Sequence, residues 1–116
     1  MAQLVFYQKP ACTTCRKVKS ELEHEGVAFE CVNYYETVFS KQKLKEILAK
    51  LKIPAAGLLR KKEPLYRELK LDQKKITEEA LIDLMLKHPD LIERPIVVKG
   101  TRAILARPAE RIREFF

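Results

Sequence analysis

Two cysteines, Cys12 and Cys15, are separated by two residues and stand where an apolar segment gives way to a helical pattern. A pair with this spacing at the start of a helix is typical of redox-active thiol sites. Unpaired backbone N–H groups there carry roughly half a positive charge, which can lower a thiol pKa from ~8.5 to between about 3.5 and 7.5. Cys12 is therefore the candidate nucleophile, and Cys15 is the candidate resolving thiol that would attack a covalent adduct on Cys12.

Two other interpretations of the pair stay open at this stage. A zinc site needs four ligands, and beyond the pair the chain offers only Cys31, His24 and His88, without paired spacing. The pair could also be two buried cysteines without chemistry, since free cysteine is among the most buried residue types. We favour the thiol site and expect no metal. We expect Cys31 to be a core or half-buried residue.

The composition of the chain predicts one domain with a basic surface. A chain of 116 residues, predicted as a single domain over 1–116, is long enough to bury a core. The formal charge of +7 suggests an anionic partner, which could be nucleic acid, an acidic protein surface or a small oxyanion. The lysines are interleaved with glutamates and no aromatic stacking motif or recognition helix is present, so we expect no direct nucleic-acid binding.

The cysteine content and the N-terminal segment suggest a compartment. Three cysteines in a highly charged chain favour a reducing cytosol over a disulfide-stabilised secreted domain. The apolar residues 1–7 are too few for a signal peptide, and no stretch is suited to span a membrane. We therefore expect a cytoplasmic protein.

The first third of the chain predicts a strand, a helix and a second strand. Residues 3–7 and 27–32 have strand composition. Between them, apolar or weakly polar positions follow helical spacing from Thr13 to about Glu25, and Gly26 ends the helix. At this spacing the three elements form a right-handed parallel crossover.

The middle of the chain predicts a helical insertion over about residues 40–90. Ser40 can cap a helix over 41–52, and Thr77 can cap another that ends before Pro89. Between these two helices the pattern is irregular and predicts short helical turns.

The last third predicts a hairpin and a closing helix. Strands over 96–98 and 101–105 flank a tight Lys99-Gly100 turn, and a helix begins at Pro108. The complete order is that of an α/β thioredoxin-like fold, with a mixed four-stranded sheet and the insertion lying between a βαβ unit and a C-terminal ββα unit. Pro95 is the candidate for the cis proline of such folds.

Four motifs in a fixed order carry a family resemblance. They are Tyr7-Gln8-Lys9-Pro10-Ala11-Cys12, Leu58-Leu59-Arg60-Lys61-Lys62-Glu63-Pro64, His88-Pro89 with Arg94-Pro95-Ile96-Val97-Val98, and Arg107-Pro108-Ala109-Glu110. With them the sequence resembles the ArsC/Spx family of thioredoxin-like proteins over nearly its whole length, most strongly its arsenate reductase branch. The resemblance implies that Cys12 is the nucleophile and that Arg60, Arg94 and Arg107 hold an oxyanion such as arsenate.

Arginine chemistry fits that implied role, although the same residues could also be ordinary surface arginines. Planar guanidinium groups give paired hydrogen bonds to a tetrahedral oxyanion. Lowering a thiol pKa from 8.5 to ~6 raises the thiolate fraction at pH 7 about thirty-fold but lowers intrinsic reactivity roughly ten-fold. Most of a large acceleration must therefore come from oxyanion positioning, which is the work of the arginines.

The resemblance implies no bound cofactor but requires a reductant. Relatives with this pattern usually carry histidine where Gln8 stands and serine where Cys15 stands. Resolution by Cys15 would give an internal disulfide reduced by thioredoxin, whereas resolution by glutathione would involve glutaredoxin.

A second hypothesis comes from the same family. The run Cys12-Thr13-Thr14-Cys15-Arg16 resembles the redox switch of Spx-type transcription regulators, which bind the RNA polymerase α subunit and contact no DNA base. The motifs at 61–64 and 107–110 belong instead to the reductase pattern, so we favour the enzyme.

Overall fold

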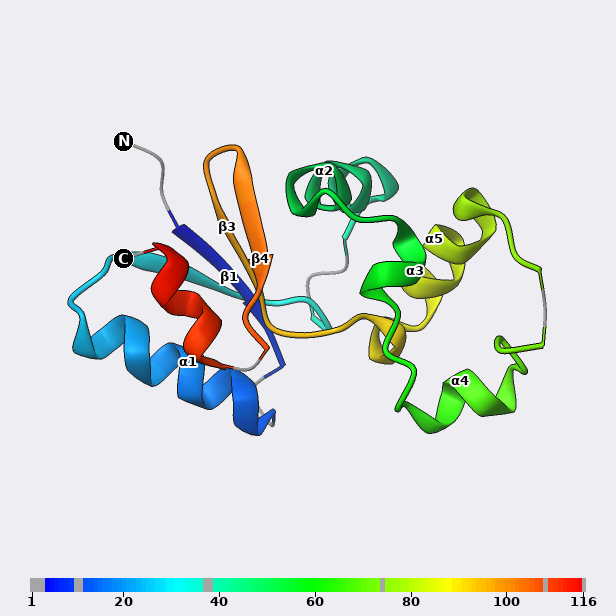
Figure 1. Ribbon diagram of the computed structural model, residues 1–116, viewed down its shortest axis with the longest axis horizontal. Helices are drawn as coiled ribbons and strands as arrows, with labels where there is room; N and C mark the ends of the chain where they lie inside the picture. The colour runs from blue at the N-terminus through cyan, green and yellow to red at the C-terminus, as the bar shows by residue number, and fades with distance from the viewer. Residues whose placement is uncertain (1–3, 10–11, 37–38, 74, 108, 116) are drawn as a thin grey trace. The chain divides into compact units, whose positions relative to one another are not determined.

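The computed structural model describes residues 4–9, 12–36, 39–73, 75–107 and 109–115. The helix start predicted at Pro108, and Pro10 and Ala11 of the first motif, lie outside these residues. The chain divides into two compact units, one made of residues 1–37 and 94–116 and the other of residues 38–93 (Figure 1). The second unit corresponds to the helical segment expected at about 40–90, and each unit is described by itself below.

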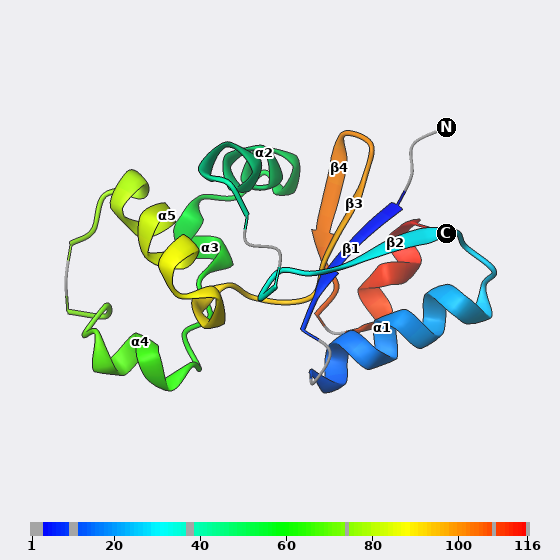
Figure 2. The same ribbon diagram turned by 180° about the vertical axis from the view of Figure 1, so that it is seen from behind.

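The first unit is built on a mixed four-stranded sheet in the order β2-β1-β3-β4 (Figure 2). The strands are β1 (Leu4–Gln8), β2 (Phe29–Asn33), β3 (Ile96–Lys99) and β4 (Arg102–Leu105). β1 pairs with β2 in parallel, while β1 with β3 and β3 with β4 are antiparallel. The predicted α/β class and mixed sheet are confirmed, and the arrangement is thioredoxin-like.

Two helices complete this unit. Helix α1 (Thr13–His24) connects β1 to β2, buries Cys15, Val18 and Leu22, and ends before Gly26, whose φ of 68° suits glycine. After β4 comes η2 (Ala109–Phe115), which is a 3₁₀-helix. Its buried residues recur every third position, and that spacing matches the three residues per turn of a 3₁₀-helix.

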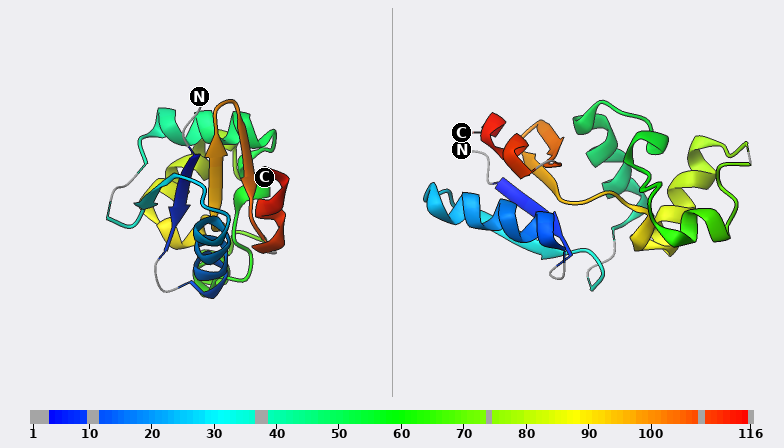
Figure 3. Two further views of the ribbon diagram at one scale, coloured as in Figure 1. Left: turned by 90° about the vertical axis from the view of Figure 1, so that its left-hand side faces the viewer. Right: turned by 60° about the horizontal axis from the view of Figure 1, so that its bottom comes forward.

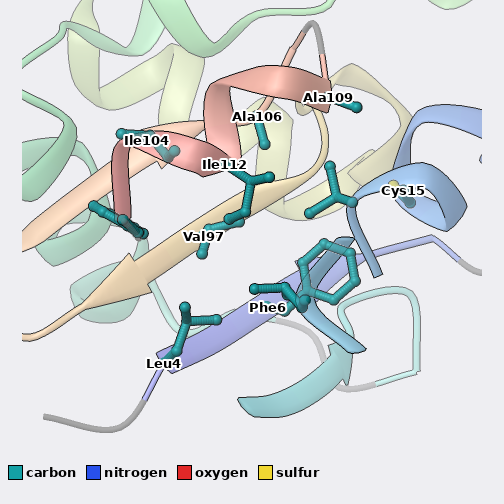
Figure 4. Close-up of a cluster of buried hydrophobic side chains, with 11 residues drawn as sticks. Leu4, Phe6, Cys15, Val97, Ile104, Ala106, Ala109 and Ile112 are labelled. Carbon is teal, nitrogen blue, oxygen red and sulfur yellow. The ribbon is translucent and has the colours of Figure 1, made fainter. Parts of the chain in front are cut away.

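The core of the first unit lies between the sheet and these two helices, which lie side by side on one face of it (Figure 1). Phe6 of β1, Val97 of β3 and Ile112 of η2 gather in it, and α1 contributes Cys15 (Figure 4). The Phe6 and Phe29 rings meet edge to face at 6.1 Å. Burial of Cys15 in this cluster fixes the position of the first turn of α1.

The second unit is helical. It contains α2 (Lys41–Leu51), α3 (Ala55–Leu58), α4 (Pro64–Glu68), α5 (Glu78–Lys87) and η1 (Pro89–Leu91), with α2 and α3 packed on α5 (Figure 3). Ser40 and Thr77 cap α2 and α5 as predicted. An antiparallel bridge between Leu59 and Ile92 joins the residue that follows α3 to the residue that follows η1.

Two sequence-based expectations are corrected by the structure. Cys31 is exposed, not buried, because β2 is an edge strand of the sheet. The hairpin turn is shifted by one residue, since Lys99 pairs with Arg102 and leaves Gly100 and Thr101 as the turn residues. Gly100 has a φ of 62°, as two-residue hairpin turns require.

Candidate functional site

Cys12 is the N-cap residue of α1. Its Sγ accepts a hydrogen bond from the backbone N–H of Cys15 at 3.4 Å, so the sulfur takes the place of the usual capping oxygen. The backbone N–H of Cys12 donates to the Lys9 carbonyl oxygen at 2.9 Å, which closes the turn between β1 and the helix. The half-buried thiol therefore lies in the positive field of the helix N-terminus.

The surroundings of Cys12 favour its thiolate. Partial burial by itself raises the pKa of Cys12, but several interactions outweigh this effect. Hydrogen bonds from the thiol and backbone of Cys15, together with the Arg94 guanidinium, lower the pKa of Cys12 below the ordinary value for a cysteine. Cys12 thus combines partial exposure with the electropositive surroundings that make a cysteine nucleophilic.

Cys15 lies in the opposite kind of environment. Its side chain is fully buried in the core, and burial, followed by the hydrogen bond and negative charge of Cys12, raises the pKa of Cys15 to about 12. Cys15 is therefore a neutral thiol at physiological pH and donates its S–H toward Cys12. Both cysteines are free thiols, as is Cys31.

Arg94 supplies the positive charge next to Cys12. The residue is only 7% exposed, and its side chain hydrogen-bonds to Cys12 and Tyr34 while Nη1 donates to the Tyr35 hydroxyl at 3.4 Å. Its Nε is buried and has no hydrogen-bond partner among the residues that the structure describes. A buried donor without a partner costs about 1–3 kcal/mol, so this N–H is a candidate donor to an acceptor that enters the site. The Arg94–Pro95 peptide bond is cis, as predicted from the sequence.

The other two predicted arginines lie in different units. Arg107 belongs to the first unit, where its Nη1 donates to the Arg94 carbonyl oxygen at 3.0 Å. The structure thus brings Cys12, Cys15 and Arg94 together and places Arg107 against the backbone of Arg94. Arg60 belongs to the second unit. There its Nε lies 3.9 Å from Glu93 Oε1, and its buried Nη1 has no hydrogen-bond partner in the described part of the chain.

Sequence reasoning missed the tyrosine pair beside Arg94. Tyr34 is fully buried, and its ring stacks on that of Tyr35 with centroids 5.0 Å apart. A signal for this pair was present: β1 and β2 are parallel, so the residues that follow them leave the sheet at the same edge. Residues 34–35 follow β2 just as the cysteine turn follows β1.

Two other kinds of site find no support in the part of the chain that the structure describes. Within it, no three His, Cys, Asp or Glu side chains gather closely enough to hold a metal ion. Also within it, none of the helices is long and apolar enough to cross a membrane.

The chain is similar to several arsenate reductases over nearly its whole length. The arsenate reductase of Neisseria meningitidis is 38% identical over 113 residues, which is 97% of each chain. The arsenate reductase of Escherichia coli is 38% identical over 114 residues, covering 98% of this chain and 81% of that protein. The solved structure of an arsenate reductase from Vibrio cholerae matches with a TM-score of 0.93 and 36% identity, over 99% of this chain and 98% of that one. The ArsC family model matches residues 7–115, and the chain belongs to the ArsC family.

Proposed function

We propose that this chain is a thiol-dependent arsenate reductase in which Cys12 is the nucleophile. The observation that carries the proposal is the contact of the Cys12 thiol, at a helix N-terminus, with buried Arg94, whose Nε has no hydrogen-bond partner among the described residues. This combination offers an activated sulfur beside a donor for an anion. The arsenate reductases among its relatives supply the reaction class.

In the first step the Cys12 thiolate attacks the arsenic atom of arsenate. A sulfur–arsenic bond forms, and one arsenic–oxygen bond breaks as a protonated oxygen leaves as water. Arg94 and Arg107 hold the remaining oxygens, and the family resemblance adds Arg60 to this set. Guanidinium groups placed beforehand stabilise the charge that develops on oxygen without having to reorganise.

In the second step a second thiol attacks the Cys12 sulfur. The sulfur–arsenic bond breaks, its electron pair stays on arsenic, and arsenite leaves while the two sulfurs form a disulfide. The second thiol is Cys15 or glutathione, and the disulfide is then reduced by thioredoxin or by glutaredoxin. No bound cofactor takes part, because two thiols supply both electrons.

Turnover of arsenate by the purified chain tests the proposal. It is measured with thioredoxin and, separately, with glutathione plus glutaredoxin, for the wild type and for Cys12→Ser, Cys15→Ser and the control Cys31→Ser. Loss of turnover in Cys12→Ser alone identifies glutathione as the resolving thiol, whereas loss in both Cys12→Ser and Cys15→Ser identifies the internal disulfide. Full turnover by Cys12→Ser would refute the proposal.

A second candidate function is redox-switched regulation in the manner of Spx. It is favoured by one feature, the contact between two free thiols at positions 12 and 15, which can be joined by oxidation. Its partner would be the RNA polymerase α subunit, and both functions fit a cytoplasmic location in which thiols stay reduced. Binding of the α subunit that depends on oxidation, without arsenate turnover, would favour the regulator.

A further inference from the structure

Arg94 is held by two tyrosines that the proposed reaction does not use. Its Nη1 donates to the Tyr35 hydroxyl at 3.4 Å, and its side chain also hydrogen-bonds to Tyr34. Tyr34 is fully buried, and the two phenol groups interact with each other. The hydroxyls of two consecutive tyrosines thus contact one guanidinium, and Tyr35 and Arg94 are 59 residues apart in the sequence.

The tyrosine pair is itself fixed in place. The rings of Tyr34 and Tyr35 stack with centroids 5.0 Å apart and an angle of 29° between their planes. The Nζ atom of Lys9 lies 4.9 Å from the centroid of the Tyr35 ring, a cation–π contact. The Lys9 carbonyl oxygen in turn accepts the backbone N–H of Cys12 at 2.9 Å. The pair is therefore joined both to Arg94 and to the turn that carries Cys12.

Phenol groups suit this position because they are neutral acceptors. A guanidinium has five N–H donors in one plane, and acceptors at defined points fix the orientation of that plane. A carboxylate would do the same but would also cancel the positive charge. Burial raises the pKa of Tyr34 to about 12, so its hydroxyl stays neutral and leaves the charge of Arg94 available to a thiolate or an oxyanion.

Building on the proposed function, we propose that Tyr34 and Tyr35 are positioning residues that hold the fully charged Arg94 guanidinium against Cys12 and the bound oxyanion. They act through Arg94 and do not themselves touch the reacting atoms. Among the described residues, the groups that act on the pKa of Cys12 are Cys15 and Arg94.

Tyrosine-to-phenylalanine variants test the proposal, because they remove one oxygen and keep the ring. Tyr34→Phe and Tyr35→Phe are compared with Tyr66→Phe, a matched control in α4 of the second unit. The first readout is the pH profile of Cys12 alkylation by iodoacetamide, which needs no arsenate. We expect both site variants to shift this profile to higher pH, because a less ordered guanidinium stabilises the thiolate less, and the control to leave it unchanged.

The second readout is arsenate turnover. Loss of a hydrogen bond lowers kcat/KM by about 3- to 10-fold in each site variant, through a lower kcat and a higher KM. In an Arg94→Lys background the same substitutions should have almost no further effect, because lysine lacks the planar fork that the hydroxyls orient. If Tyr34→Phe does not fold, the comparison of Tyr35→Phe in the wild-type and Arg94→Lys backgrounds alone tests the proposal.

Three results would overturn the proposal. The first is a Cys12 alkylation profile in the site variants equal to that of Tyr66→Phe, and the second is a shift of that profile to lower pH. The third is a loss of kcat/KM on tyrosine substitution that is as large in the Arg94→Lys background as in the wild type. Failure of the proposed function looks different. In that case wild-type protein turns over no arsenate, yet the tyrosine variants still shift the Cys12 profile, and the positioning role stands without the reductase reaction.

Discussion

The unpartnered Nε of Arg94 predicts that an oxyanion stabilises the folded protein. Arsenate that supplies the missing acceptor gains a hydrogen bond to a charged donor, worth about 1.5–3 kcal/mol, and removes the cost of the buried unpaired N–H. Because only the folded protein presents this site, binding shifts the unfolding equilibrium. The Cys12→Ser variant is the protein to use, since it cannot react covalently with arsenate.

The size of the effect follows from mass action. Arsenate at ten times its dissociation constant adds about 1.4 kcal/mol to the free energy of unfolding. With an unfolding entropy of ~2.1 cal/mol/K per residue, this corresponds to a rise in Tm of about 6 °C for 116 residues that unfold together. Adding Arg94→Lys weakens binding about 10- to 100-fold, because lysine lacks Nε and the fork, and the rise should then fall below about 2 °C.

The assay is thermal unfolding in an arsenate titration, with chloride at equal ionic strength as the solvent control. Arg111→Lys, also in the Cys12→Ser background, is the matched substitution, since Arg111 is an exposed residue paired with Glu114. We expect this variant to keep the full rise in Tm. An equal rise in the Arg94→Lys and Arg111→Lys proteins, or no rise beyond that given by chloride, would refute the assignment of the Arg94 Nε as an oxyanion donor.

Three further predictions concern Cys15, the ion pairs of the second unit and the core. Cys15→Ala removes the S–H donor to Cys12, so the rate of Cys12 alkylation by iodoacetamide at pH 6 should fall. The expected fall is about five-fold, which corresponds to the free energy of one hydrogen bond. An unchanged rate would contradict this role of Cys15. Hydrogen bonds from lysines, of which that from Lys41 is the strongest, lower the pKa of Glu79 to about 2. At low salt and above about pH 4.3 the wild type should therefore have a higher Tm than Glu79→Gln. This difference in Tm should disappear as the pH falls toward 2 and Glu79 becomes protonated. Ile112→Ala leaves a cavity in a fully buried site and should cost about 2–5 kcal/mol in urea unfolding; a loss under 1 kcal/mol would show that the core collapses around it.

Helix starts were predictable because their signals are local. Ser40 and Thr77 precede apolar periodic segments, and in the structure their side-chain oxygens accept the N–H groups of Lys43 at 3.1 Å and Ala80 at 3.2 Å. A capping hydrogen bond joins residues three positions apart, so the sequence window that predicts it also contains both partners. The same holds for Cys12, the cap of α1.

Burial on the sheet was less predictable because it depends on strand order. The segment around Cys31 has the apolar composition of a buried strand, yet β2 lies at the edge of the sheet and leaves that thiol exposed. Nothing near Cys31 in the sequence says which neighbours its strand has. The hydrogen bond that its Sγ accepts from Gln8 Nε2 at 3.1 Å likewise depends on the pairing of β1 with β2.

The sequence predicted the reactive residues of the candidate site but not the residues that hold them in place. The spacing of Cys12 and Cys15 indicated a thiol pair, and only the family resemblance singled out Arg94 among 23 lysines and arginines. The contact of Arg94 with Tyr34 and Tyr35 joins segments far apart in sequence through a buried guanidinium. Long-range polar contacts of this kind leave no periodic pattern, so the sequence shows the residue types and only the fold shows which ones meet.

The opposite environments of the two cysteines give the proposed reaction an order. The Cys12 sulfur interacts with the Cys15 S–H, and the negative charge of the Cys12 thiolate form helps to raise the pKa of Cys15. Once the Cys12 sulfur is bound to arsenic it no longer carries that charge, which removes one of the influences that raise the pKa of Cys15. Cys15 therefore becomes easier to deprotonate only after Cys12 has reacted. If Cys15 is the resolving thiol of the proposed reaction, the contact that activates Cys12 also disfavours ionisation of Cys15 until Cys12 has reacted.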